Sequence, residues 1–288
     1  MITICTMVKN EDDIVEKWIE YHGEIFGYKN LIIIDNYSTD NTYNICRKYV
    51  QNGIILVRKD NYLLKGEYMT FYKNTIKSDI FIPLDIDEFI CYYDKNNNTV
   101  SKKRDIIINY LMSLVKSNLF NGIYKMNYID PINTNNKRGL QKFTHGIIND
   151  YKNHAKTFVI KKYIPNDFVF DHGNHYYTDD YIMSDLYLIH YHARSHYQYV
   201  KKCSANITGL NYPINLDILK KMRDNNSCQG HHHINNMVSL LENPSRNFGP
   251  ALNNNISDNW IYIKDILENN LINNTNNINN WKYIKYLI

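Results

Sequence analysis

The sequence contains no long hydrophobic run. Although 44% of its 288 residues are hydrophobic, no apolar stretch approaches the roughly 20 residues that a membrane-spanning helix needs. The start, from Met1 to Lys9, has neither a basic segment before its apolar residues nor a small-residue cleavage site. We therefore expect a soluble, cytoplasmic protein without a transmembrane segment, and peripheral association with a membrane stays open.

Cysteine and strong charge are also scarce. The five cysteines form no Cys-x-x-Cys pair, which argues against a disulfide framework and a zinc knuckle and favours a reducing compartment. The net charge of +4 is mild and the basic pairs are dispersed, so a nucleic-acid partner is not expected. The 26 tyrosines accompany heavy use of Ile, Asn and Lys, and we expect them to be packing residues. No internal repeat of fixed period occurs, and the oligomeric state is open.

The first half of the chain alternates strand and helix patterns. Buried strands are expected at residues 2–7, 31–35, 54–57 and 80–85, and helices at 14–25, 38–49 and 67–77. Gly27 closes the first helix. Repeated β-α units with apolar strands predict an α/β, Rossmann-like fold, a mostly parallel sheet with helices on both faces.

The second half has looser patterns. A helix is expected at residues 106–115, and strands at 122–129, 157–160 and 185–190. From Tyr197 onward helical and Asn-rich stretches dominate, and residues 281–288 are expected to form a helix docked on the body. We therefore divide the chain into an α/β domain, residues 1–202, and a helical, Asn-rich C-terminal extension, residues 203–288, packed on the core.

Residues 80–90 carry the most informative pattern, an apolar strand that delivers two carboxylates to its carboxyl end. Side chains i and i+2 of a strand point to the same side, so Asp85 and Asp87 can reach one divalent cation while Ile86 points into the core. The structural alternative is a solvated acidic turn after an edge strand.

Two further polar clusters fall at the same kind of position. Lys9-Asn10-Glu11 follows the first expected strand, and Asp35-Asn36 follows the second. Ligands of doubly wound sheets bind at the carboxyl ends of the strands. The three clusters together favour a ligand site at that edge over an isolated acidic turn.

Four blocks, in this order, resemble nucleotide-diphospho-sugar glycosyltransferases of the GT-A fold, in the family-2-like and family-92-like group. The blocks are Met7 to Glu11 with Trp18 to His22, Ile34 to Thr42, Leu84 to Ile90, and His190 to Ser195 followed by Tyr199 to Lys202. The resemblance covers roughly residues 1–202. It implies the metal-dependent transfer of a hexose from a nucleotide-diphosphate donor, a UDP-sugar, to a glycan or glycoprotein acceptor, with inversion at the anomeric carbon.

The resemblance also implies a metal site at Asp85, Asp87 and His190. Asp87 is expected to be a direct ligand, Asp85 to make a ribose or water-mediated contact, and His190 to arrive from a later strand. A metal that bridges both phosphates acts as a Lewis acid on the leaving diphosphate. Oxygen ligands with one imidazole fit Mn²⁺ or Mg²⁺ better than zinc.

The expected nucleotide-sugar contacts come from both ends of the α/β domain. They are Lys9, Asn10, Glu11, Asp35, Asp85, Glu88 and Lys202. Asp35 matches the family position that meets the base or ribose, and an Asx turn explains it as well. Glu88 either binds the sugar or caps the following turn, and Lys9 is more simply solvated. Lys201 and Lys202 also fit an exposed basic helix face.

The catalytic base is the least defined role. Inverting enzymes of this fold are expected to use an Asp or Glu to take the acceptor proton. Asp150 and Asp130 are the first candidates by position and Asp171 is the third, and each also fits a loop or cap position.

Two groups of histidines stand outside these assignments. His172 and His175 either line the acceptor side or belong to a turn around Gly173. The run from His231 to His233 is internal, and adjacent histidines on one loop rarely all face one ion, so we leave it out of the site.

Two other functions stay open. Haloacid-dehalogenase-like phosphatases also place Asp-x-Asp after an apolar strand, but they want Thr or Val where this chain has Phe89, and their motif lies near the start of the fold. The other alternative is a non-catalytic GT-A-like domain that binds carbohydrate or a partner. The undefined base favours that alternative, and the presence of Asp85, Asp87 and His190 argues against it.

Overall fold

The computed structural model describes residues 1–117, 121–132, 145–149, 155–176, 179–192, 196–225, 228, 230–242 and 260–263. The elements of the first half are β1 (Ile2–Val8), α1 (Val15–Phe26), β2 (Leu31–Asp35), α2 (Thr42–Lys48), β3 (Ile55–Arg58), α3 (Lys65–Thr75), β4 (Ile80–Leu84), β5 (Glu88–Asp94), β6 (Thr99–Ser101) and α4 (Arg104–Lys116). Those of the second half are β7 (Ile123–Ile132), β8 (His145–Asn149), β9 (Lys156–Ile160), β10 (Ile182–His190), α5 (His196–Gly209), α6 (Leu216–Asn225), α7 (His231–Glu242) and β11 (Trp260–Tyr262).

One sheet runs through the described residues, and its N-terminal part is parallel. The strand order there is β4-β1-β2-β3, with Ile4 opposite Leu31 and Ile2 opposite Ile80. Most later pairings are antiparallel: β9 pairs with β4, β7 with β8 and β9, and β5 with β6 and β10. β10 also lies parallel to β7, so that β5, β10 and β7 are neighbours.

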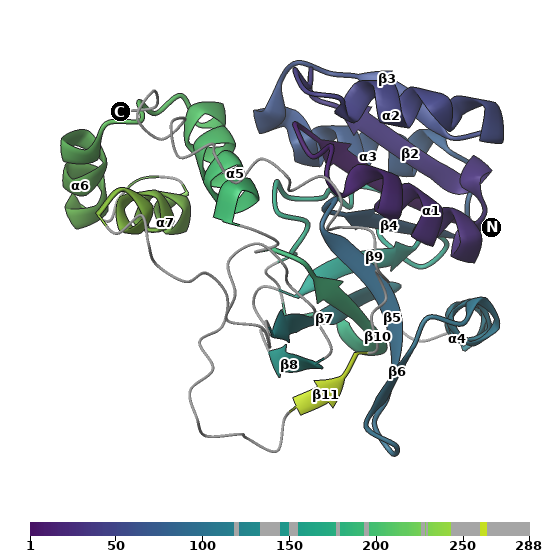
Figure 1. Ribbon diagram of the computed structural model, residues 1–288. Helices are drawn as coiled ribbons and strands as arrows, with labels where there is room; N and C mark the ends of the chain where they lie inside the picture. The colour runs from purple at the N-terminus through teal and green to yellow at the C-terminus, as the bar shows by residue number, and fades with distance from the viewer. Residues whose placement is uncertain are drawn as a thin grey trace.

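Helices cover both faces of the parallel strands (Figure 1). Side chains alternate between the two faces with a period of two. Ile4 and Ile33 belong to a core shared with α1, α2 and α4, whereas Cys5 and Ile32 belong to a second core shared with α3. The strands are apolar throughout because both of their faces are buried. The N-terminal part therefore has the α/β, Rossmann-like arrangement predicted from the sequence.

The elements expected in residues 1–84 are confirmed, with ends that shift by a few residues. Gly27 ends α1 as expected, with a φ of 89° that favours glycine. The stretch from Ile80 to Ile90 differs from the expectation, because it consists of two strands, β4 and β5, joined by a turn.

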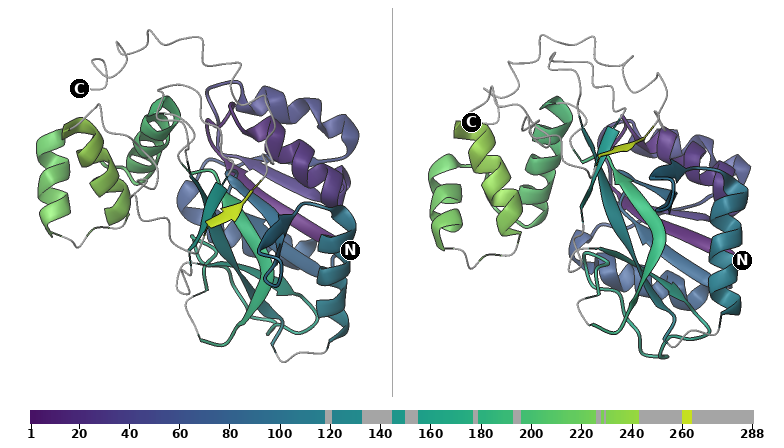
Figure 2. Two further views of the ribbon diagram at one scale, coloured as in Figure 1. Left: turned by 60° about the horizontal axis from the view of Figure 1, so that its bottom comes forward. Right: turned by 90° about the horizontal axis from the view of Figure 1, so that it is seen from below.

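The C-terminal helices form a group of their own beside the sheet (Figure 2). α5, α6 and α7 share a small core that includes Ile207, Leu219 and Val238. The division proposed at residue 202 falls inside α5, and β11, from the extension, pairs with β8 and β6 of the sheet. The helix expected at residues 281–288 lies outside the described residues. None of the described helices is both long and apolar enough to cross a bilayer.

Candidate active site

The polar clusters of the sequence meet at one edge of the sheet. β1, β2 and β4 run parallel, so the loops that follow them leave the sheet at the same edge. In Figure 1 the N-terminus lies at the right, and α5 faces the opposite, carboxyl ends of these strands.

α1 fixes the segment that follows the acidic turn. Trp18 Nε1 donates a hydrogen bond of 3.1 Å to the Glu88 carbonyl, and the Tyr21 hydroxyl donates one of 2.6 Å to the Ile90 carbonyl. Both side chains are buried at helical spacing on α1. The start of β5 is therefore held against α1, which sets the position of Asp87 directly before it.

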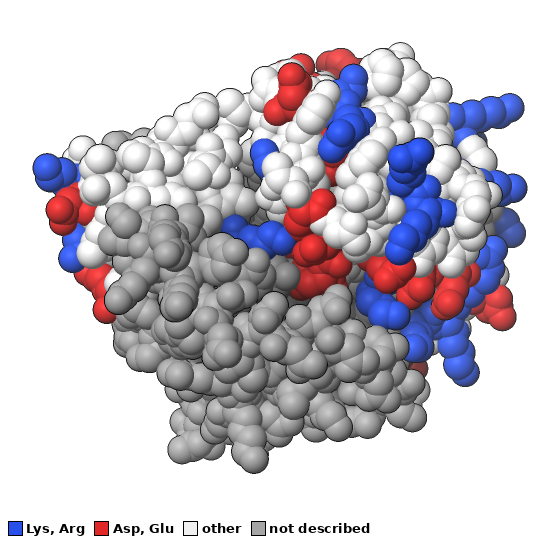
Figure 3. All heavy atoms as spheres, turned by 45° about the horizontal axis from the view of Figure 1, so that its top comes forward, with Lys and Arg blue, Asp and Glu red and all other residues white. Residues whose placement is uncertain are grey.

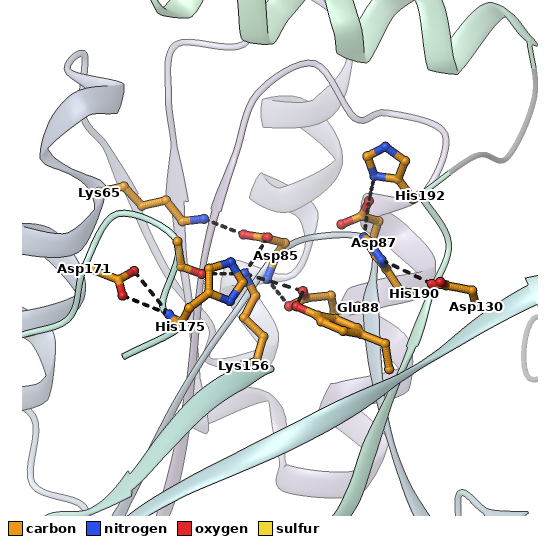
Figure 4. Close-up of polar contacts among 12 residues, drawn as sticks. Lys65, Asp85, Asp87, Glu88, Asp130, Lys156, Asp171, His175, His190 and His192 are labelled. Atoms are coloured by element: carbon orange, nitrogen blue, oxygen red, sulfur yellow. Dashed lines mark hydrogen bonds and ion pairs between the residues drawn. The ribbon is translucent and has the colours of Figure 1, made fainter. Parts of the chain in front are cut away.

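Asp87 is the centre of the first of two polar groups at this edge (Figure 4). Its Oδ2 lies 3.5 Å from His190 Nε2 and 3.9 Å from His192 Nδ1. One ligand atom from each of these residues lies within 4.8 Å of the other two, and among the described residues no other such trio of metal-binding side chains occurs. The Lys202 ammonium of α5 pairs with Asp87 Oδ2 and lies 3.1 Å from His192 Nδ1. We call Asp87, His190 and His192 the Asp87 group.

The charges around the Asp87 group set its protonation. Burial alone would lower the pKa of His190, but Asp87 and Asp130 raise that pKa to about 9. The charge of Lys202, followed by burial, lowers the pKa of His192 well below its ordinary value. Burial opposes ionisation of Asp87, yet Lys202 and His190 hold its pKa well below the usual range. At neutral pH the group therefore contains a carboxylate, an imidazolium and a neutral imidazole.

Asp85 is the centre of the second polar group (Figure 4). Its Oδ1 pairs with the Lys65 ammonium, and its Oδ2 lies 2.7 Å from Lys156 Nζ. The Asp85 side chain is 35% exposed, whereas both lysines are buried. Burial alone would raise the pKa of Asp85, but Lys156 and Lys65 lower it well below the usual range. Lys156 also donates a hydrogen bond of 2.8 Å to the Gly173 carbonyl, so this lysine links Asp85 to the backbone of the loop after β9.

The two aspartates contact different partners, although strand alternation predicted that both would reach one ion. The Glu88 N–H lies 3.2 Å from the Asp85 carbonyl and donates to it, and the Asp85 N–H donates to Glu88 Oε2 at 2.8 Å. These bonds close a turn, and side chains i and i+2 of a turn need not point the same way. Asp85, predicted to be a metal residue, therefore lies outside the Asp87 group.

Glu88, expected either to bind the sugar or to cap the turn, is almost fully buried. Its Oε1 accepts a hydrogen bond of 3.0 Å from the Tyr128 hydroxyl and lies 3.5 Å from Lys156 Nζ. Burial raises the pKa of Glu88. With 1% of its surface exposed, this side chain caps the turn through its bond from the Asp85 N–H.

The residues after β1 tie their loop to the loop after β2. Asn10 Oδ1 accepts a hydrogen bond of 2.7 Å from the Thr39 N–H, and the Glu11 N–H donates one of 2.8 Å to Thr42 Oγ1. Lys9 is exposed, as a solvated lysine would be. Asn10 and Glu11 therefore shape the edge, and Lys9 projects from it.

Asp35, expected to meet the base or ribose or to form an Asx turn, is fully buried. Its carboxylate accepts hydrogen bonds from the Ser38 N–H, at 3.2 Å, and from Arg58 Nε, at 2.9 Å. The Arg58 guanidinium lies over the rings of Tyr37 and Tyr43, at 4.8 and 4.1 Å from their centroids. The Asx-turn contact of Asp35 is present, and Tyr37, beside Arg58, is exposed.

α5 reaches the edge through two consecutive lysines. Lys201 Nζ lies 2.6 Å from Asp40 Oδ2 and 3.2 Å from Asp12 Oδ1, while Lys202 pairs with Asp87. The three carboxylates come from three different loops, after β2, β1 and β4. On the face seen in Figure 3, basic and acidic side chains adjoin in the middle of the molecule, between the helical part at the left and the α/β part at the right.

The candidate bases fall in different places. Asp130 Oδ1 lies 3.6 Å from His190 Nδ1, beside the Asp87 group. Asp150 lies outside the described residues. Asp171 accepts hydrogen bonds from the His175 backbone N–H at 3.1 Å, as a loop residue would. Asp130 is therefore the candidate base that the structure brings next to the Asp87 group.

His172 and His175, singled out in the sequence, do not belong to the Asp87 group. His172 packs edge-on against Tyr62, with ring centroids 4.6 Å apart. Burial, followed by the charge of Lys156, lowers the pKa of His175 to about 4. The run from His231 to His233 begins α7 and is not a loop.

Three residues of the site were missed from the sequence. His192 had a signal, because it stands two positions after His190, the same spacing that was used for the aspartates. Lys156 had a weaker one, a lysine directly before an apolar strand sequence. Lys65 had none, because its partner Asp85 lies 20 residues away across a helix and a strand.

The Asp87 group fits a divalent transition-metal ion. One carboxylate oxygen and two imidazole nitrogens suit first-row transition metals such as Fe²⁺ and Zn²⁺ and can also hold Mn²⁺, whereas Mg²⁺ prefers an all-oxygen shell. The Asp87 carboxylate and the neutral His192 ring already have the protonation states that bind a metal ion. His190 would release a proton on binding, and the Lys202 ammonium would leave its place on the shared oxygen and nitrogen.

Comparison with known proteins gives distant structural likenesses. No protein-family model matches the chain, and no curated protein matches it. A glucosyl-3-phosphoglycerate synthase from Mycobacterium tuberculosis, in complex with Mn²⁺, uridine diphosphate and glucosyl-3-phosphoglycerate, is 18% identical over 44% of this chain and 44% of its own, with a TM-score of 0.31. The structure of S. aureus TarS 1–349 is 8% identical over 84% of this chain and 70% of its own, with a TM-score of 0.44.

This chain thus covers less than half of the mycobacterial synthase chain. At these identities and TM-scores, neither likeness assigns a substrate or residue roles to this chain. The chemistry of the site depends on its own side chains.

Proposed function

We propose that this protein is a metal-dependent glycosyltransferase that moves a hexose from a UDP-sugar to a hydroxyl of a glycan or glycoprotein, with inversion. The observation that supports this proposal is the Asp87 group at the carboxyl edge of a parallel sheet, where ligands of such folds bind. Asp87, His190 and His192 would hold the ion, with Mn²⁺ favoured over Mg²⁺. Once bound, the ion supplies Lewis-acid stabilisation of the diphosphate leaving group.

The side chains of the chain have separate tasks in this proposal. Asp85 is held in one orientation by two buried lysines and keeps an exposed part that can accept a ribose hydroxyl. Lys202 can pair with a phosphate oxygen when it leaves Asp87, because an ammonium is a compact donor to phosphate. The base that takes the acceptor proton is Asp150 or Asp130 in this proposal.

Thermal unfolding with a set of sugar nucleotides tests the donor site. We expect a UDP-sugar to raise the melting temperature with Mn²⁺ present and to have little effect with EDTA. A ligand at 100 times its dissociation constant adds about 2.7 kcal/mol to the stability of the folded state. Asp87→Ala should remove the effect, whereas Asp185→Asn, a partly exposed carboxylate on β10 paired with Lys95, should keep it.

Equal stabilisation with Mn²⁺ and with EDTA, and in wild type and Asp87→Ala, would contradict the metal-dependent donor site. Metal-dependent binding without any hydrolysis or transfer of the sugar would instead identify a non-catalytic binding domain. Release of uridine diphosphate in the presence of Mn²⁺ separates the two outcomes.

A further inference from the structure

We propose that Asp130 is a positioning residue that orients His190 for metal binding, and that it is not the catalytic base. This inference rests on the function proposed above and assigns one of its two candidate bases to a different task. The observation behind it is that the two ring nitrogens of His190 face two different carboxylates.

The geometry is specific to each nitrogen. His190 Nε2 lies 3.5 Å from Asp87 Oδ2, on the metal side, and Nδ1 lies 3.6 Å from Asp130 Oδ1, on the other side. Figure 4 shows the imidazole between the two carboxylates. A carboxylate at Nδ1 favours the tautomer with the proton on Nδ1, and that tautomer leaves the Nε2 lone pair available for a metal.

The sheet fixes this arrangement. β7 and β10 run parallel with Ile129 opposite Ile189, so Asp130 and His190 are the next pair along the two strands. Asp130 lies inside β7 and His190 is the last residue of β10, and β7 also pairs with β8 at Asp130, which is opposite Ile147. A residue whose backbone is fixed by strand pairing is suited to orienting its neighbour.

The packing of the ring agrees with a fixed orientation. The Tyr128 ring lies 5.1 Å from the His190 ring, centroid to centroid, and the Tyr128 hydroxyl is anchored on Glu88. His190 is therefore confined by Tyr128 as well as by the two carboxylates. Outer carboxylates of this kind change metal affinity by about 10- to 100-fold when they are removed.

Mn²⁺ binding measured by electron paramagnetic resonance tests the inference without an activity assay. We expect Asp130→Ala to weaken Mn²⁺ binding by about 10- to 100-fold. Asp130→Asn should lose less, because its amide oxygen can still accept the Nδ1 proton. Asp185→Asn, on β10 but paired with Lys95, serves as the matched control and should bind Mn²⁺ like wild type. Thermal melting of each variant without metal verifies that the fold is kept.

Two results separate failure of this inference from failure of the proposed function. If folded Asp130→Ala binds Mn²⁺ as tightly as wild type but no longer transfers sugar, Asp130 is the base and the inference is wrong. If wild type itself binds no Mn²⁺, or Asp87→Ala binds it equally well, the proposed metal site is wrong.

Discussion

At the scale of single residues, Lys202 occupies the place that a cation would take. Its ammonium shares Asp87 Oδ2 and His192 Nδ1, two of the three ligand atoms of the Asp87 group. A metal ion and this ammonium therefore compete for the same two atoms. Loss of the ammonium should therefore raise the affinity for the metal and lower the affinity for the nucleotide.

Replacement of the Lys202 ammonium should separate these two effects. We expect Lys202→Met to bind Mn²⁺ alone about tenfold more tightly, or about 1.4 kcal/mol, because the competing charge is gone. The same variant should bind uridine diphosphate with Mn²⁺ more weakly, because a phosphate partner is lost. Calorimetric titration measures both, and Lys201→Met, the neighbour that pairs with Asp12 and Asp40, is the control. Unchanged Mn²⁺ affinity in Lys202→Met would show that the ammonium does not compete.

Asp85 should behave as a structural anchor and not as a metal ligand. Asp85→Asn leaves Lys65 and Lys156 buried with less opposing charge. We expect the free energy of unfolding to fall by about 3 kcal/mol, the lower end for a broken buried pair because Asp85 is partly exposed. Urea unfolding measures this loss, and Mn²⁺ affinity of the folded variant should stay close to that of wild type. A stable Asp85→Asn protein that no longer binds Mn²⁺ would place Asp85 among the ligands.

At the scale of elements, α1 both fills the core and holds the start of β5. His22 is fully buried in it, with Nδ1 2.9 Å from the Trp18 carbonyl and Nε2 3.5 Å from the Ile90 nitrogen. The carbonyl requires a proton on Nδ1 and the N–H requires a lone pair on Nε2, so the neutral ring fits this site. Burial accordingly lowers the pKa of His22 from 6.5 to about 3.

This buried histidine gives the fold an acid sensitivity with a defined sign. Between about pH 6.5 and about pH 3 the unfolded chain binds one proton more at His22 than the folded chain does. Stability from this residue is therefore complete above pH 6.5 and falls as the pH falls, by about 1.4 kcal/mol per pH unit. We expect the unfolding free energy of His22→Phe to depend less steeply on pH. Its slope should be lower by about 1.4 kcal/mol per pH unit, which corresponds to one proton, as measured by urea unfolding at several pH values. An unchanged slope would mean that His22 is protonated in the folded state.

The elements differ in how far the sequence predicts them. From β1 to β4 each strand is a short apolar run, and α1 buries residues at helical spacing, so local pattern and fold agree there. The turn after Leu84 is different, because the bonds between Asp85 and Glu88 and the pairing of β5 with β10 decide where the strand stops. Those partners are distant in the chain or depend on a side-chain cap, and strand alternation alone does not reveal them.

At the scale of the whole molecule, the site is assembled from distant parts of the chain. Asp87 comes from the turn after β4, Asp130 from β7, His190 from β10 and Lys202 from α5. The resemblance predicts that Asp87 and His190 lie together, and the structure places Asp87 Oδ2 3.5 Å from His190 Nε2. The roles of Lys156 and Asp130 could not be predicted from the sequence, because they depend on how β9, β7 and β10 pair.

The central claim is that the Asp87 group binds a divalent metal, and one diffraction measurement tests it most directly. Crystals grown with Mn²⁺ and uridine diphosphate would give an anomalous difference map at a wavelength where manganese scatters. The account predicts a peak in contact with Asp87, His190 and His192, next to the diphosphate, with Lys202 displaced from Asp87. A peak beside Asp85, or diphosphate bound at this edge with no metal near Asp87, would contradict it.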